Sequence, residues 1–271
     1  MPAPEVDVAV VGAGVAGLAG AAELALKARV VVIDRLPADG GVLGYEHPLV
    51  RSLRQEAVRA GAAFKLGTTA LRWTGTHLLL AGPGGIGWTM ARHLVYAGGS
   101  RPSTPAELGI AGERLAGVLP ATVAAHLMEA QVRLGTVVAV VGSSDWGRRV
   151  AAALAGQRAQ VIAVALPGEA PPDFGAERLC GFAPLRVDGR SRVEQLTLSR
   201  GAQVERIACS AVILAARLVP LRNVDGAIFA GGAVTFAQPV ADRSTADRVA
   251  EEARQAARGA WASMAGLSGA V

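Results

Sequence analysis

VAVVGAGVAGLA at residues 8–19 leads through an alanine-rich segment to VVVIDR at residues 30–35. An apolar run of strand length, the pattern Gly12-x-Gly14-x-x-Gly17, a segment of helix length and a second apolar run ending in an acid make one complete strand–helix–strand unit. Such a unit presents the N-terminus of its helix to the phosphates of a dinucleotide. The stretch therefore predicts a nucleotide-binding α/β fold.

The glycines have separate physical roles in this pattern. Gly12 permits a sharp turn, and Gly14 lacks a Cβ, so a pyrophosphate can approach the backbone at the helix N-terminus. Val15 and Ala16, in the first helical turn, are further candidate contacts. Gly17 lets the helix lie close to the sheet.

The second apolar run ends in Asp34 and Arg35, both candidate cofactor contacts. A carboxylate at the end of this strand can accept hydrogen bonds from the two hydroxyl groups of an adenosine ribose, and it repels a ligand that carries a 2′-phosphate. The alternative interpretation is a plain structural turn, or a site that has lost its ligand.

The composition is that of a globular α/β protein. The 271 residues favour two domains, and 51% hydrophobic with only 4% aromatic residues suits packed α/β layers. The formal net charge of +5 comes almost entirely from arginines interspersed with acids, without a basic tract. This pattern argues against a nucleic-acid partner.

The two cysteines, Cys180 and Cys209, are far apart and form no Cys-x-x-Cys pair. We interpret them as buried free thiols, and we predict no metal site. The N-terminus has no basic region before an apolar one, and no uninterrupted apolar stretch is long enough to span a bilayer. We therefore expect a soluble, cytoplasmic protein without a membrane span.

The segment after Asp34 predicts a loop, a helix and a small antiparallel meander. Gly40 and Gly41 lie in a glycine-rich loop that can pass close to a long cofactor, with a surface loop as the alternative. We predict a helix over residues 49–60, short strands within 63–88, and a separate strand at 93–96. Gly98 and Gly99 follow that strand and either approach a ligand or form a plain turn.

The opening pattern then returns in a weaker form. A linker at 108–119 and a helix at 121–132 precede TVVAVVGSSDWG at 136–147, a helix at 148–156 and a strand at 160–164. The weak second site consists of Gly142, Ser144 and Gly147. Ser144 replaces the middle glycine, and residues 165–167 read Ala-Leu-Pro, with neither a ribose-binding acid nor an arginine for a 2′-phosphate. We therefore expect only weak NAD(P) binding in this copy.

The remaining segments complete the second unit and return to the first. We predict two hairpin strands within residues 185–206 around Gly201, and a buried strand at 211–216. A last strand at 233–239 and a helix at 245–261 follow. The charged residues of that helix fit a solvated face.

This order of parts resembles the two-dinucleotide-domain flavoproteins related to thioredoxin reductase. The motifs are the Gly12/Gly14/Gly17 pattern, the Gly40-Gly41 pair, AGGSRP at 97–102, the inserted second unit and the return to the first domain. Residues 108–122, LGIAGERLAGVLPAT, look most like FAD-carrying subunits of heteromeric dehydrogenases acting on sarcosine, opines or hydroxyproline, and of cyanide synthase.

The resemblance implies an α/β fold of two Rossmann-like, three-layer ββα domains, the second inserted in the first. Residues 1–116 with 221–271 would bind FAD, and residues 117–220 would form a degenerate NAD(P)-binding-like domain. The implied FAD contacts are Gly12, Gly14 and Gly17 at the pyrophosphate, Asp34 at the ribose, and Gly40, Gly41, Gly98 and Gly99 along the cofactor.

The sequence also departs from these relatives. It has no Cys-x-x-Cys pair, which excludes disulfide reduction of the thioredoxin reductase type. The Gly-Asp that relatives carry after the last strand reads Gly231-Gly232 or Gln238-Pro239 here, and an Ala-x-Gly strand end reads Ala215-Ala216-Arg217. These changes fall at the flavin end of the implied site.

The resemblance implies an FAD-dependent oxidoreductase, as one subunit of a heteromeric amine- or amino-acid-oxidising dehydrogenase. Its partners would be a second flavoprotein, a small iron–sulfur subunit, or both. Two alternatives stay open: a non-catalytic nucleotide-binding assembly or regulatory subunit, and a stand-alone NAD(P)H-dependent flavin reductase. Tyr45, His47 and Arg101 are polar groups near the predicted cofactor loops, and no residue is identified as catalytic.

Overall fold

The computed structural model describes residues 6–175, 177–221, 234–237 and 246–267. The chain divides into two compact units. Unit 1 contains Met1–Ser100 and Pro220–Val271, and unit 2 contains Arg101–Val219. The predicted fold, with one α/β unit inserted in another, is therefore observed.

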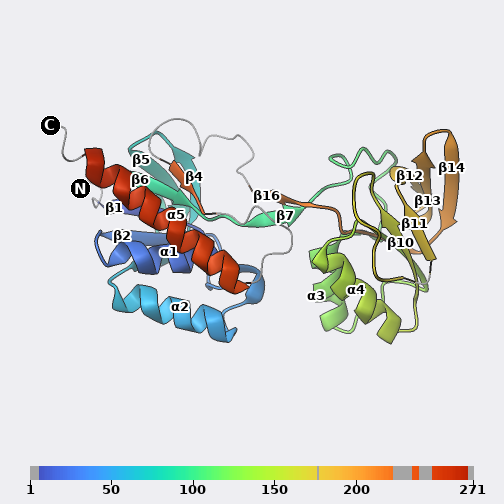
Figure 1. Ribbon diagram of the computed structural model, residues 1–271, viewed down its shortest axis with the longest axis horizontal. Coiled ribbons are helices and arrows are strands. Elements are labelled where there is room, and N and C mark those ends of the chain that lie inside the picture. The colour runs from blue at the N-terminus through green and yellow to red at the C-terminus, as the bar shows by residue number, and fades with distance from the viewer. Residues whose placement is uncertain (1–5, 176, 222–233, 238–245, 268–271) are drawn as a thin grey trace. The chain divides into compact units, whose positions relative to one another are not determined.

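Unit 1 is built around parallel strands covered by helices on one face (Figure 1). The strands lie in the order β3 (Ala63–Leu66), β2 (Val30–Asp34), β1 (Val6–Val11), β6 (Gly85–Tyr96) and β17 (Val234–Phe236). The helices are α1 (Val15–Ala25), α2 (Pro48–Arg59) and α5 (Ala246–Leu267). Alternation along β1 divides the core, because Val8 and Val10 pack on the helical side and Ala9 on the other.

The other face of this sheet is covered by an antiparallel meander of β4 (Thr69–Trp73), β5 (His77–Gly82) and the first half of β6. Trp73, Leu78 and Leu80 form its buried side. The predicted meander is present, but its last strand and the predicted strand at 93–96 are one strand, β6. No glycine or proline interrupts residues 88–96, so the chain runs from antiparallel pairing with β5 into parallel pairing with β1.

Unit 2 repeats this three-layer plan. Its parallel strands lie in the order β11 (Glu177–Cys180), β10 (Gln160–Ala165), β9 (Val137–Val141), β15 (Ala211–Leu214) and β8 (Val118–Pro120). Helices α3 (Ala121–Glu129) and α4 (Asp145–Gly156) pack on one face. The other face carries the antiparallel strands β12 (Ala183–Gly189), β13 (Val193–Arg200) and β14 (Gln203–Ala208). Residues 183–208 thus form three strands, whereas we predicted two strands within residues 185–206.

The chain enters unit 2 at Arg101, earlier than the predicted boundary at residue 117. Part of the predicted linker is built into unit 2: Ile110 lies in its core, and Ala111 and Ala116 form bridges with Arg186 and Arg192. The glycines of this segment suggested a linker, but its apolar residues have partners far along the chain that periodicity does not reveal.

The remaining elements are the 3₁₀ turn η1 (Gly41–Leu43), β7 (Ser100–Pro102) and β16 (Leu218–Pro220), which pairs with β7. Residues 231–232 and 238–239, where we looked for the Gly-Asp motif, lie outside the described residues. Cys180 and Cys209 are free thiols, and burial raises the pKa of Cys209 to about 11. Among the described helices, none has both the length and the apolar character for crossing a membrane.

Candidate functional site

The carboxyl ends of β1, β2 and β6 meet at the turn around Gly12. Its N–H donates to the carbonyl oxygen of Ile33 at 2.8 Å, and the N–H of Ala97 donates to that of Val11 at 2.8 Å. Gly12 has a φ of +110°, and a Cβ there would overlap the backbone of Ala97. Gly12 is therefore required by the packing of three strand ends.

Gly17 is also required by packing. It lies in α1 directly over the turn, and a Cβ at this position would overlap the carbonyl oxygen of Gly12. The absence of a side chain lets the first turn of α1 rest on the end of β1. This brings the helix N-terminus to the carboxyl edge of the sheet.

Gly14 differs from the other two glycines. Its φ is −79°, which any residue adopts, and the nearest atom to a Cβ there would be the Cα of Gly41 at 3.8 Å. Packing within the protein therefore leaves room for a side chain. Gly14 is the N-cap of α1, no side chain caps this helix, and its first turn carries no acid. The N–H groups of this turn remain available to an anion, and the bare Cα leaves the space for it.

Asp34 lies beside this turn at the end of β2. One carboxylate oxygen accepts the N–H of Ala13 at 2.6 Å, and the other accepts that of Leu36 at 2.8 Å. A carboxylate has about four lone-pair sites, so each oxygen can accept one further hydrogen bond, as a ribose hydroxyl requires. Asp34 thus also fixes the glycine turn, a role that the sequence did not reveal.

The loop with Gly40 and Gly41 closes over the same turn. The N–H of Gly40 donates to the carbonyl oxygen of Ala13 at 2.8 Å. Both glycines have positive φ angles, and a Cβ on Gly41 would lie 3.2 Å from the Cα of Gly14. The exposed side chains of Val42 and Tyr45 continue this loop and give it an apolar outer surface.

The structure brings six of the predicted glycines together at this edge: Gly12, Gly14, Gly17, Gly40, Gly41 and Gly98. Val15 and Ala16 are buried in the first turn of α1. The other two candidates lie differently: Arg35 is exposed in the loop after β2, and Gly99 accepts the N–H of Leu221 at 2.9 Å. The contacts of these residues with a cofactor remain predictions.

Unit 2 has the same backbone framework. Gly142 donates to the carbonyl oxygen of Val164 at 2.8 Å, as Gly12 does to Ile33, and Gly147 packs closely on Ala215. The helix end differs. Ser144 caps α4 by accepting the N–H of Gly147 at 3.4 Å, and Asp145 places a carboxylate in the first turn. The Ser144 hydroxyl therefore takes one of the N–H groups that an anion would bind, and the Asp145 carboxylate is paired with Arg148.

Sequence reasoning missed an acid at the second turn. Residues 165–167 contain none, but Glu169 reaches back to accept the N–H of Ser143 at 3.1 Å and that of Leu166 at 3.2 Å. It thus holds the N–H of Ser143 as Asp34 holds that of Ala13. The signal was an acid just after Pro167-Gly168, where Gly168 has a φ of +82° and reverses the chain.

Glu169→Ala is expected to loosen the turn of unit 2. The N–H groups of Ser143 and Leu166 lose their acceptor, which costs about 1 kcal/mol because Glu169 is half-buried and water can replace it. Hydrogen exchange measured by mass spectrometry should become faster in peptides that cover residues 142–147. Glu177→Ala, at an exposed residue of β11, is the matched control. Equal exchange rates in both variants would contradict the role of Glu169 as the acceptor that holds this turn.

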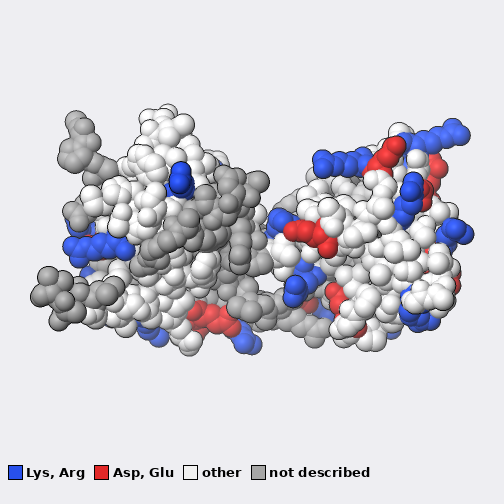
Figure 2. Space-filling model, turned by 90° about the horizontal axis from the view of Figure 1, so that it is seen from above, with Lys and Arg blue, Asp and Glu red and all other residues white. Residues whose placement is uncertain are grey.

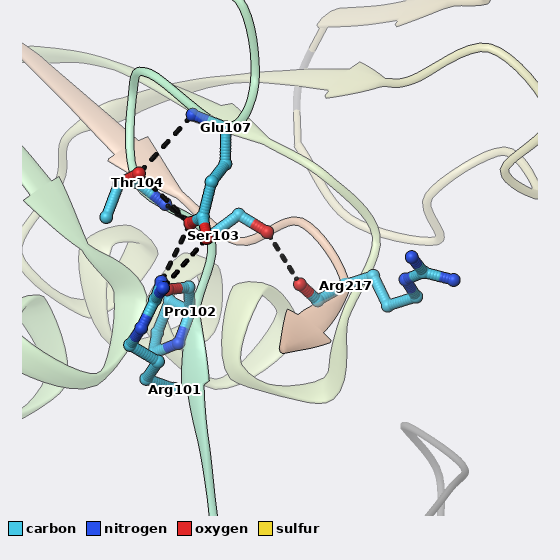
Figure 3. Close-up of polar contacts among 6 residues, drawn as sticks. All are labelled: Arg101, Pro102, Ser103, Thr104, Glu107 and Arg217. Atoms are coloured by element: carbon cyan, nitrogen blue, oxygen red, sulfur yellow. Dashed lines mark hydrogen bonds and ion pairs between the residues drawn. The ribbon is translucent and has the colours of Figure 1, made fainter. Parts of the chain in front are cut away.

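A polar cluster lies where the chain enters unit 2 (Figure 3). The guanidinium of Arg101 donates to both oxygens of Glu107, at 2.7 and 2.8 Å, and the N–H of Thr104 donates to the same carboxylate at 2.8 Å. These bonds lower the pKa of Glu107 to about 2. The Ser103 hydroxyl donates to the carbonyl oxygen of Arg217 at 2.9 Å, and the Arg217 side chain extends away from the cluster.

This cluster predicts a pH-dependent contribution to stability. The folded-state pKa of Glu107 lies below the ordinary value of about 4.3, so its contribution is present above that value and is lost as the pH falls through about 2. The difference in urea midpoint between the wild type and Glu107→Gln should therefore be largest at neutral pH and shrink towards pH 2. A difference that is the same at every pH would contradict this.

Tyr45 and His47 are the other polar residues that we named from the sequence, and His47 has a local structural role. The His47 side chain caps α2, because its Nδ1 accepts the N–H of Leu49 at 3.3 Å. Tyr45 is exposed. Within the described ranges, no three His, Cys, Asp or Glu side chains gather as they would to hold a metal ion.

Solved structures of other proteins share this arrangement of strands and helices. No family model and no curated protein matches the sequence. Among solved structures, the thioredoxin reductase of T. acidophilum aligns with a TM-score of 0.66 and 13% identity over 96% of this chain and 99% of that one. The chain has the thioredoxin reductase fold. The resemblance predicted from the sequence motifs is therefore confirmed at the level of the fold.

Two other structures with this fold are oxidoreductases by name. L-proline dehydrogenase from P. horikoshii is 22% identical, with a TM-score of 0.55 over 80% of this chain. The chain spans only 43% of that dehydrogenase chain. A water-forming NADH oxidase from Lactobacillus brevis, solved with NADH, is 16% identical, with a TM-score of 0.64 over 94% of this chain and 69% of that one.

Proposed function

We propose that this chain is an FAD-dependent oxidoreductase and serves as one subunit of a heteromeric amine- or amino-acid-oxidising dehydrogenase. One observation carries the cofactor assignment: Gly14 has room for a side chain yet has none, at a helix end without a cap. Because packing in the protein does not require glycine there, we assign the space to a ligand. A pyrophosphate fits the free N–H groups and the positive dipole end that this helix presents there.

In this proposal the residues of unit 1 hold the cofactor. The turn from Gly12 to Ala16 binds the pyrophosphate, and the free lone pairs of Asp34 accept the adenosine ribose hydroxyls. The loop at Gly40 and Gly41 and the backbone at Gly98 follow the cofactor. The bound flavin supplies hydride and electron transfer, while the protein orients it and limits its contact with water.

The dehydrogenase assignment is supported by the similarity to L-proline dehydrogenase, which is more than twice as long as the aligned region. Within the described residues we find no pair of side chains arranged as a general base and its partner near the glycine turn. We therefore propose that another subunit, a second flavoprotein or a small iron–sulfur protein, completes the substrate site or accepts the electrons.

The structure of unit 2 argues against the stand-alone NAD(P)H-dependent flavin reductase. A dinucleotide there would have to displace the Ser144 cap, at a helix end that already carries a carboxylate, Asp145, paired with Arg148. The non-catalytic subunit uses the nucleotide site of unit 1, with FAD or an adenine nucleotide as ligand, for assembly or regulation, so it is separated from our proposal by experiment.

Anaerobic spectroscopy tests the proposal directly. The purified chain is mixed with FAD, freed of unbound flavin, and titrated first with NADH and NADPH and then with dithionite. We expect a flavin spectrum that persists with both nicotinamides and bleaches with dithionite. Failure to bind FAD would reject the proposal. Rapid bleaching by a nicotinamide would favour the flavin reductase. Binding of an adenine nucleotide in place of FAD would favour the non-catalytic subunit.

A further inference from the structure

The β5–β6 hairpin ends in an apolar tip. From Leu78 to Gly87 the chain reads LLLAGPGGIG, and no side chain in it carries a hydrogen-bonding group. The backbone of this tip is paired within the hairpin, from His77 opposite Met90 to Gly82 opposite Gly85. The tip therefore has few groups that require water, which lowers the cost of placing it in an apolar medium.

One side of the hairpin is buried and the other is exposed. Leu78 and Leu80 pack under the meander with Trp73. On the opposite side, alternation along β6 brings Ile86, Trp88 and Met90 to one face, with exposed fractions of 75%, 44% and 38%. Cross-strand pairing adds Ala81 beside Ile86, Leu79 beside Trp88 and the exposed His77 beside Met90. We call the five apolar residues of this side the hairpin face: Leu79, Ala81, Ile86, Trp88 and Met90.

The charged side chains of β4 and β6 nearest the hairpin face are arginines. No aspartate or glutamate occurs between Glu56 and Glu107 in the sequence. Arg72 pairs with Leu79 from the neighbouring strand β4, and Arg92 follows Met90 on the same side of β6, where it lies 3.8 Å from Asp7. Seen from above in Figure 2, the described part of unit 1 shows white atoms with separate blue side chains, and red side chains at its lower edge.

From this combination we propose that the hairpin face docks on the headgroup region of an anionic lipid bilayer. Exposed aliphatic residues and a tryptophan would enter the interface, and Arg72, opposite Leu79, would contact lipid phosphates. A protein interface typically forms about one hydrogen bond per 100–200 Å² of its area. Residues 78–87 offer no side chain for such bonds, and the polar atoms beside them belong to the rings of Trp88 and His77. Because tryptophan is common at the bilayer interface, a lipid surface fits the hairpin face better.

The proposal is independent of the cofactor assignment. The hairpin face belongs to the meander layer, whereas the glycine turn lies at the carboxyl ends of β1, β2 and β6. Membrane docking can therefore fail while FAD binding holds, and the reverse is also possible. Docking at the surface does not require a membrane-spanning segment.

Vesicle co-sedimentation tests the proposal. The full chain is mixed with vesicles of POPC alone and of POPC with roughly 30% POPG. We expect binding to the anionic vesicles that is at least about tenfold weaker for Ile86→Ser/Trp88→Ser and weakened in the same sense by Arg72→Glu, by added salt, and on POPC alone. The matched control is Val123→Ser/Leu185→Ser, which removes exposed apolar residues from unit 2 and should bind like the wild type.

Circular dichroism and thermal midpoints establish that each variant is folded. Absence of wild-type binding to the anionic vesicles would overturn the proposal, as would equal binding by the hairpin variant. Sedimentation velocity is a second test, because it detects a dimer of the chain. A dimer that forms at micromolar concentration and disappears in Ile86→Ser/Trp88→Ser would assign the hairpin face to a second copy of the chain and would also overturn the proposal.

Discussion

Gly14→Ala is expected to weaken FAD binding about 100-fold while the cofactor-free protein melts at nearly the same temperature. The added Cβ fits within the protein, with its nearest neighbour at 3.8 Å, so the fold is preserved. The same carbon lies in front of the α1 N-terminus and moves the pyrophosphate away from the N–H groups. Loss of one or two charge-assisted hydrogen bonds, at about 1.5–3 kcal/mol each, accounts for that magnitude.

Fluorescence titration of FAD gives the affinity, and differential scanning fluorimetry without FAD gives the midpoint. The matched control is Ser144→Gly, at the equivalent position of unit 2, which should leave FAD affinity unchanged because it alters only the α4 cap. Wild-type affinity in Gly14→Ala would place the pyrophosphate elsewhere. A large fall in the midpoint without FAD would mean that Gly14 is required by packing after all.

Gly17→Ala is expected to destabilise unit 1 by about 3 kcal/mol or more, with or without FAD. The added Cβ overlaps the carbonyl oxygen of Gly12, which cannot yield because the same turn joins the ends of β1, β2 and β6. The helix must shift off the sheet, and overpacking of this kind costs about 1–3 kcal/mol even where side chains can adjust. Here the obstacle is backbone.

Scanning calorimetry is the suitable measurement, because two units can unfold in separate transitions. Gly20→Ala on the same helix is the control: its nearest neighbours, in Ala253 and Ala257, would lie at 3.7 and 3.9 Å. Alanine is favoured over glycine in a helix by about 1 kcal/mol, so this variant should be equally or more stable. A Gly17→Ala protein as stable as Gly20→Ala would disprove the packing argument.

Much of the fold follows from local patterns. The strand–helix–strand units and the meander after α2 were predicted from apolar periodicity and glycine spacing, which depend on residues a few positions apart. The insertion of one unit in the other was implied by the family resemblance. The continuity of β6 and the contribution of residues 101–116 to unit 2 were missed. Both depend on pairing with distant segments: β6 pairs with β1, and residues 111 and 116 pair with Arg186 and Arg192.

The candidate site shows the same division. Comparison of the two glycine motifs identified Ser144 as the important difference, because the replacement of the middle glycine by serine is evident from the sequence alone. It did not identify Glu169, which lies beyond the strand end and reaches the turn only through a reversal at Gly168. It also gave Asp34 a single role, since its bond to Ala13 joins residues that are distant in sequence.

The sequence by itself determined that a nucleotide-type glycine turn exists, that it is followed by a weaker copy, and that both belong to α/β units. The position of each glycine in the motif gave it an expected role, but it did not give the atoms that approach each glycine. Only the tertiary structure decided that Gly12 and Gly17 are required by backbone packing while Gly14 has space in front of it. The physical reason is that the requirement for glycine depends on the atoms that approach from elsewhere in the chain, or from a ligand.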